Sequence, residues 1–273
     1  MIDALASGLS SQGGWVLVLP CVAALVGASV QRTTGFGFGF IAGAGMLSVF
    51  NPIVAVVYAT IANVFLSGVS AWQLRQDINY RVTWLLVIWL GVGTIAGLAV
   101  IGIALRWWLQ SLALVVTFWS IYQGVSAMRA RHCKSLGAEA AEPPSASWPS
   151  ASVPGILAGF LGTCLAIPGP PVIGYLMRLG MSPSVVRATL LAFFSLSSLL
   201  RLIVFPFLFA MPTFNVVVLT LIVTATIIGT VFGVILSRIV PENWFAYINL
   251  SALAGSAIVL LGALVIHFTS SGF

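Results

Sequence analysis

Six apolar segments of about 20 residues run through this sequence, and they constrain the fold more than any other feature. A helix rises about 1.5 Å per residue, so each segment is long enough to cross a hydrocarbon layer of about 30 Å. Only 6% of the residues are charged, where a soluble domain has about 25%. The sequence therefore predicts an all-α, polytopic membrane protein whose long segments are 53–74, 82–104, 107–128, 184–204, 213–236 and 242–267.

Four shorter apolar segments form two adjacent pairs. Segments 14–31 and 36–50 meet at a glycine-rich break, and segments 153–166 and 170–179 meet at a proline-rich one. A non-helical stretch at membrane depth is tolerated only where it is buried in protein or lines a wet cavity. Whether the short segments cross the membrane or re-enter it is left open, so eight to ten transmembrane segments are expected.

The two halves of the chain resemble each other. Both contain two short segments followed by three long ones, and four motifs recur in the same order. Internal repeats are a common way to build a transporter. We expect a first repeat over 14–128, a cytoplasmic linker rich in proline, serine and charge over 129–152, and an inverted second repeat over 153–267. The recurring motifs are Leu25-Val26-Gly27 with Leu157-Ala158-Gly159, Pro52 with Pro183, Gly93-Thr94-x-x-Gly97 with Gly229-Thr230-x-x-Gly233, and Trp108 with Trp244.

Arginine and lysine predict the orientation, because cytoplasmic loops are enriched in both. The loop with Arg75 and Arg81 and the linker from Arg129 to Lys134 are the richest in cations, and two long segments separate them. Both are therefore predicted to be cytoplasmic. Both termini then lie outside, which in a bacterial inner membrane means the periplasm.

The candidate binding site lies at the two breaks. A polar cluster interrupts the first apolar pair, and a helix start with unpaired N–H groups, which suits an anion, follows each break. Two alternatives remain open: the glycines could serve only close helix packing, and the arginines of segment 184–204 could be interface anchors. The predicted substrate-binding residues are Gln31, Arg32, Thr33, Thr34, Gly35, Gly37, Asn63, Pro168, Gly169, Pro170, Arg187, Ser198 and Arg201.

The five acidic residues all lie outside the interiors of the predicted segments, which disfavours a cation as the substrate. A membrane potential of about 100 mV contributes about 2.3 kcal/mol per charge to the exit of an anion, so export needs no coupling group. Uptake would need a coupling ion, a proton or sodium, which stays open together with a homodimer. We expect a small anionic substrate and a lipid bilayer as partners. No metal, cofactor or nucleic acid is expected, since the three cysteines are far apart and the cations form no patch.

Several of these motifs together resemble a known family. They are Gly27 to Gly45, Asn51-Pro52, the Gly162 to Pro171 element, and Ser182-Pro183 leading to Arg187-Ala188-Thr189. In this order and spacing they resemble the TauE/SafE sulfite exporter family, whose members include proteins like 4-toluene sulfonate uptake permeases. The chain departs from the common pattern at Phe38, at Phe40 and at Leu165-Ala166-Ile167. The resemblance implies an integral anion permease of the bacterial inner membrane, for sulfite or small organosulfonates such as sulfoacetate.

The leading hypothesis is thus a sulfite or organosulfonate transporter that binds its substrate between the two breaks. An uptake permease for another small oxyanion or carboxylate and a non-transport scaffold subunit are the alternatives. A membrane enzyme is disfavoured, because the segments hold no cluster of histidine and acidic residues for acid-base or metal chemistry.

Overall fold

The computed structural model describes residues 15–101, 106–135, 146–208 and 215–239, with scattered residues between 251 and 265. The described elements are all helices, which confirms the all-α prediction. They are α2 (Trp15–Thr34), α3 (Phe38–Val49), α4 (Pro52–Gln73), η1 (Arg75–Asp77), α5 (Tyr80–Ile101), α6 (Arg106–Ser135), α7 (Trp148–Leu165), α8 (Gly169–Arg178), α9 (Pro183–Leu208) and α10 (Val216–Ile239).

Five of these helices are long and apolar enough to cross a membrane, which confirms a polytopic membrane protein. They include four of the six predicted long segments, and α6 covers the fifth. The sixth, 242–267, lies mostly outside the described residues. The five spans are Leu17–Thr34, Pro52–Gln73, Tyr80–Val100, Pro183–Phe207 and Val216–Ile239.

Both breaks are short. The polar cluster from Gln31 to Thr34 forms the last turn of α2, so the first break is only residues 35–37. Gly35 and Gly37 have positive φ angles of 93° and 122°, which let the chain reverse there. The second break is residues 166–168. It begins at Ala166, in the left-handed conformation with φ of 59°.

Both breaks lie beside the middle of a long helix. Gln31, next to the first break, bonds to Asn63 near the centre of α4, and Gly169, after the second, packs on Phe194 near the centre of α9. The helices that leave the breaks have 12 and 10 residues, about 18 and 15 Å, which is too short to cross the membrane. The pairs α2–α3 and α7–α8 are therefore helical hairpins whose tips lie beside the middle of α4 and α9.

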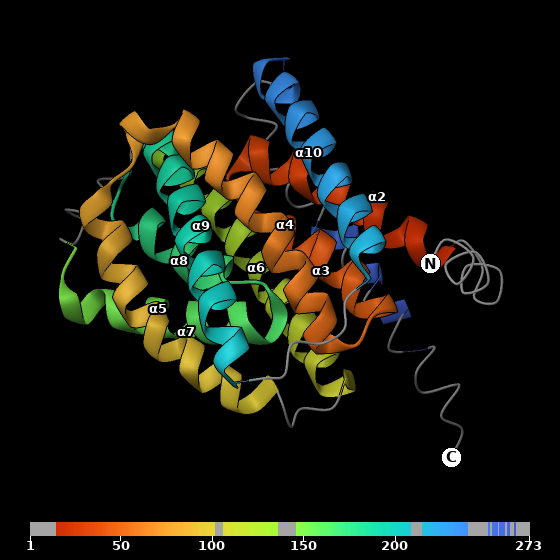
Figure 1. Cartoon of the computed structure of the whole chain (residues 1–273). Helices are drawn as coiled ribbons and strands as arrows, with labels where there is room; N and C mark the ends of the chain where they lie inside the picture. Colours follow the sequence, from red (N-terminus) through yellow and green to blue (C-terminus); the bar gives the residue numbers. More distant parts are fainter. Residues whose placement is uncertain are drawn as a thin grey trace, which may run out of the picture.

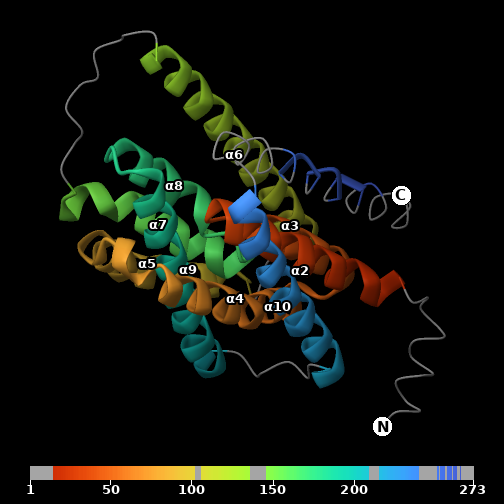
Figure 2. The ribbon, with the colours of Figure 1, turned by 90° about the horizontal axis from the view of Figure 1, so that it is seen from above.

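The helices form two bundles that meet along α4 and α9, which lie side by side in the middle of the molecule (Figure 1). The first bundle contains α2, α3, α4 and α10, and the second contains α5, α7, α8 and α9. Figure 2 shows α10 packed across α2, and α6 leaning out from the bundles at one side. The predicted linker start at 129 falls within α6, which continues to Ser135.

The recurring glycine motifs make matching contacts. On α5, Gly93 and Gly97 pack against the carbonyls of Ile156 and Phe160, which stand four residues apart on α7. On α10, Gly229 and Gly233 pack in the same way against the carbonyls of Leu25 and Ser29 of α2. Small residues let the helix backbones approach closely in a membrane. Thus α5, from the first half of the chain, packs in the bundle that contains the second hairpin. In the same way α10, from the second half, packs in the bundle that contains the first hairpin.

A side chain at Gly93 should loosen the second bundle. A Cβ there would overlap the carbonyl group of Ile156, whereas Gly91, on the same helix, faces open space. We expect Gly93→Ala to cost about 1–3 kcal/mol and to lower the unfolding temperature of the purified protein, because the backbones of α5 and α7 must separate. Gly91→Ala is the control and should unfold at the wild-type temperature or above. Equal unfolding temperatures for the two variants would contradict this account.

Candidate functional site

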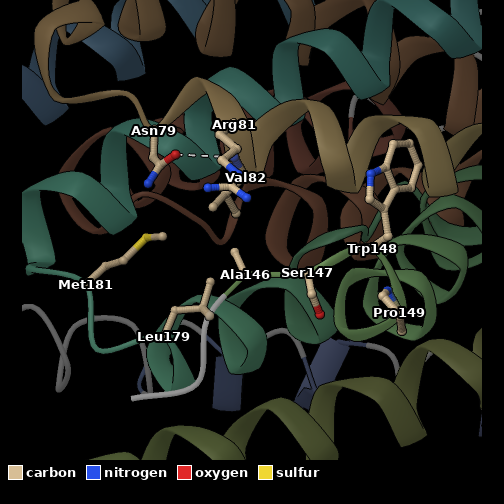
Figure 3. Close-up of a pocket in the computed structure, with 9 residues that line it drawn as sticks. All are labelled: Asn79, Arg81, Val82, Ala146, Ser147, Trp148, Pro149, Leu179 and Met181. Carbon is tan, nitrogen blue, oxygen red and sulfur yellow. Dashed lines mark hydrogen bonds between the residues drawn. The ribbon is translucent and has the colours of Figure 1, made fainter. Parts of the chain in front are cut away.

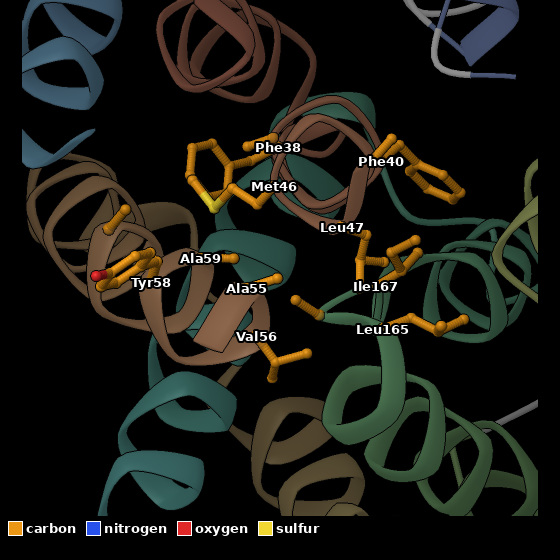
Figure 4. Close-up of a cluster of buried hydrophobic side chains, with 14 of the residues drawn as sticks. Phe38, Phe40, Met46, Leu47, Ala55, Val56, Tyr58, Ala59, Leu165 and Ile167 are labelled. Carbon is orange, nitrogen blue, oxygen red and sulfur yellow. The ribbon is translucent and has the colours of Figure 1, made fainter. Parts of the chain in front are cut away.

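The tips of the two hairpins touch. A Cβ on Gly39, in the first turn of α3, would overlap the carbonyl oxygen of Ala166 in the second break, and one on Gly43 would lie 3.2 Å from the carbonyl oxygen of Leu165. Figure 4 shows Leu165 and Ile167 of the second hairpin near Leu47 and Phe40 of α3. These side chains share one buried apolar cluster, so the packing of each hairpin depends on the other.

A small cavity lies between the tips. The space open to the centre of a water molecule is about 10 Å³, roughly the room for one water. Residues from both hairpins, from α4 and from α9 line the cavity. They are Gln31, Phe36, Gly37, Gly39, Phe40, Asn63, Ala166, Ile167, Pro168, Gly169 and Phe194, and five of them, Gln31, Gly37, Asn63, Pro168 and Gly169, belong to the predicted site.

Side-chain amides form the polar wall of this cavity. The Gln31 Nε2 group donates to Asn63 Oδ1 at 2.9 Å and to Ser67 Oγ at 2.8 Å, while Gln31 Oε1 accepts from the amide of Phe38 at 3.2 Å. The Asn63 Nδ2 group donates to Ser198 Oγ at 3.0 Å. Buried polar groups need such partners, and here they connect α2, α3, α4 and α9.

Arg201 lies behind this wall and is 1% exposed. Its guanidinium donates to Ser197 Oγ at 2.9 Å and to Ser198 Oγ at 3.1 Å, and its buried Nε has no acceptor. Gly162 leaves the room that the guanidinium occupies, next to Pro168 of the cavity wall. The alternative that Arg201 is an exposed interface anchor is therefore wrong, because the side chain turns inward to α7.

No acidic group balances Arg201 in the described part of the chain. Asp77 is the one acidic residue there, and it lies exposed in η1. A buried charge without a counter-charge is costly, and hydroxyl groups compensate it only in part. An anion that entered the site would supply the missing charge.

Three other predicted residues do not line the cavity. Thr33 and Thr34 donate to the carbonyl of Val30 at 2.8 and 2.9 Å, so their hydroxyls complete the end of α2. Pro170 is buried in the first turn of α8, where it has no N–H to offer an anion. The expectation that these three line the site is not met.

Arg32, Gly35 and Arg187 form a second group. Arg32 donates from Nη2 to Gln73 Oε1 at 2.7 Å, and Arg187 donates to the carbonyl oxygen of Arg32 and packs on Gly35. The structure thus divides the predicted residues between two places.

Sequence reasoning missed Phe194 and Ser197 as parts of the site. Both belong to a long apolar segment, where a phenylalanine or serine looks like an ordinary packing residue. A signal was present for Ser197, since it lies four residues before Arg201 and so on the same helical face.

A wider pocket of about 670 Å³ opens elsewhere, where α5 and α7 begin and α8 ends. Figure 3 shows Arg81 and Trp148 on its sides, with the Asn79 side chain bonded to the amide of Val82 at 3.2 Å. Its lining includes none of the predicted substrate-binding residues. The cavity between the hairpin tips is therefore the candidate site.

The site suits a small anion. Its polar side chains are the amides of Gln31 and Asn63, the Arg201 guanidinium lies behind them, and helix N-termini face it from both hairpins. In the first turn of α3, the Phe38 amide is bonded to Gln31, and those of Phe40 and Ile41 are bonded to the Gly37 carbonyl. Among the contacts of the described residues, none involves the amides of Gly37, Gly39 or Gly169, which all line the cavity.

Comparison with known proteins identifies the family of the chain. A search of curated proteins and a search of solved structures give no match. The family model described as "Sulfite exporter TauE/SafE" matches residues 7–260, nearly the whole chain. The chain therefore belongs to the TauE/SafE sulfite exporter family.

Proposed function

We propose that this chain carries sulfite or a small organosulfonate such as sulfoacetate across the membrane, and that it binds the anion between the two hairpin tips. One observation carries the proposal. The cavity at the tips has amide donors on its wall and behind them a fully buried arginine that no described acid balances. A sulfonate or sulfite group has several oxygens that can accept bonds from such donors.

The cavity holds about one water, so a sulfite ion does not fit until the tips move. When they separate, the anion reaches Gln31, Asn63 and the amide of Gly39, and Arg201 exchanges its serine partners for anion oxygens. An arginine gives planar, paired hydrogen bonds to an oxyanion, which a serine hydroxyl does not match. The resting contacts with Ser197 and Ser198 keep Arg201 in place between transport cycles.

The inverted repeat supports alternating access. We take the repeats to be 14–128 and 153–267, joined by a cytoplasmic linker at 129–152. The matching contacts of α5 with α7 and of α10 with α2 support this division. Because the two hairpins enter from opposite faces of the membrane, opening of one hairpin tip exposes the binding site to one side of the membrane only. The bundles move relative to each other along α4 and α9, where polar bonds can exchange.

Export is the favoured direction. The potential across a bacterial inner membrane drives an anion outward, and no acidic residue of this chain lies inside a predicted span to bind a coupling proton or sodium. We place the end with Arg75, Arg81 and Arg178 in the cytoplasm and both termini outside. Uptake of another small oxyanion or carboxylate and a scaffold role are the alternatives to be tested.

A flux assay tests the proposal. We expect proteoliposomes loaded with radiolabelled sulfite to release it when a potential is imposed, and Arg201→Gln to reduce the rate about tenfold or more, since a charged hydrogen bond to the anion is lost. Arg178→Gln, which removes an exposed charge, should keep the wild-type rate. Sulfoacetate, isethionate, sulfate and acetate as competitors define the substrate. No release by the wild type of any of these anions would favour the scaffold alternative.

Closure of the tips can be tested separately with Gly39→Ala. The added methyl group overlaps the carbonyl of Ala166, so we expect the tips to stay apart and sulfite flux to fall several-fold. Gly68→Ala on α4 is the matched control, because its added Cβ would lie 3.6 Å from Ser195 Oγ, an ordinary contact. Wild-type flux in Gly39→Ala would show that the tip contact plays no part in transport.

A further inference from the structure

Arg32 is a second buried cation, and two of its three side-chain nitrogens have no acceptor. It is 6% exposed, and its Nε and Nη1 atoms are buried without an acceptor. The acceptor that the structure gives for its guanidinium is the amide oxygen of Gln73, which is neutral. A snorkelling arginine would expose its head group to water or lipid phosphate, and Arg32 does not.

The fold makes room for Arg32 and brings a second cation next to it. A Cβ on Gly233 of α10 would lie 2.6 Å from Cβ of Arg32, so the glycine lets the side chain fit against α10. Arg187 of α9 bonds to the carbonyl oxygen of Arg32, and its side chain packs on Gly35. Two arginines thus lie next to each other. Asp77, the one acidic residue of the described chain, forms no ion pair with Arg32.

This place is distinct from the cavity at the tips. Arg187 and Arg201 are 14 residues apart on α9, which separates their backbones by about 21 Å. Gln73 follows Asn63 by ten residues on α4, or about 15 Å. Gln31 and Arg32 are neighbours in the sequence but face different partners, Asn63 and Gln73. Gln73 is exposed at the end of α4, so the Arg32 site lies close to the surface that carries Arg75.

We propose that Arg32, Arg187 and Gln73 form a second anion site, which receives a sulfite or sulfonate anion from the cytoplasmic side before it moves to the cavity at the tips. The inference rests on the proposed function for the identity of the anion. The Arg32 Nε and Nη1 groups donate to the oxygens of the anion, and the Gln73 amide turns to donate its N–H. The charge of the bound anion reduces the repulsion between the two arginines. The Gln31 side chain lies on the path of the anion from this site to the cavity at the tips.

Counting bound sulfite tests the second site. Equilibrium dialysis of the purified protein against radiolabelled sulfite, at concentrations up to saturation, should give two ions per chain for the wild type. We expect one ion for Arg32→Gln, one for Arg187→Gln, one for Arg201→Gln and two for the control Arg178→Gln. Arg32→Lys, which keeps the charge, should bind two ions, one of them more weakly. The unfolding temperature of each variant, measured without sulfite, shows that it is folded.

The outcomes separate the two proposals. Arg32→Gln and Arg187→Gln variants that are folded and bind as many ions as the wild type would overturn the second site and leave the cavity at the tips untouched. A wild type that binds one ion, lost in Arg32→Gln and kept in Arg201→Gln, would support the second site while contradicting the proposed function. If the wild type binds no sulfite, both proposals are wrong.

Discussion

The side chain of Gln31 connects the parts of this structure. It donates to Asn63 and Ser67 on α4 and accepts from the first amide of α3, so one residue ties both arms of the first hairpin to a membrane-spanning helix. Without it, the amide of Phe38 would be buried without its acceptor, at a cost of about 1–3 kcal/mol. The position of the hairpin tip, and hence the contact with Ala166, depends on these bonds.

The arrangement of the two bundles follows from the contact between the two hairpin tips. Within a membrane, a helix break has backbone groups that lipid cannot satisfy, so protein must surround it. Neither half of the chain does this alone. The first hairpin is enclosed by its own α4 and by α10 from the other half, and the second by α9 and by α5. The glycines of the recurring motifs are needed because this enclosure brings helix backbones into contact.

Much of this could be predicted from the sequence. Hydrophobic length identified four of the five described helices that are long enough to span, whereas the segment that forms α2 was expected to be short. The glycines and prolines marked both breaks. The polar cluster at 31–34 was harder, because a helical last turn and an irregular loop have the same composition. The hydroxyls of Thr33 and Thr34 bond to the carbonyl of Val30 within this last helical turn, and sequence spacing does not reveal such bonds. The burial of Arg201 depends on the space left by Gly162, which is distant in sequence. A contact between residues so far apart in the sequence can be recognised only when the fold is known.

The prolines of α8 make the two hairpins mechanically unequal. Pro170 and Pro171 fix their own φ angles and remove two amide donors from the first turn of α8, whereas the matching turn of α3 reads Phe38-Gly39-Phe40-Ile41. The α3 tip can therefore bend by rotation about glycine and keeps its backbone amides, while the prolines hold the α8 tip more rigidly. The barrier to opening should thus differ between the two membrane faces, so that a carrier with a pseudo-symmetric fold would still have unequal rates for its two half-cycles.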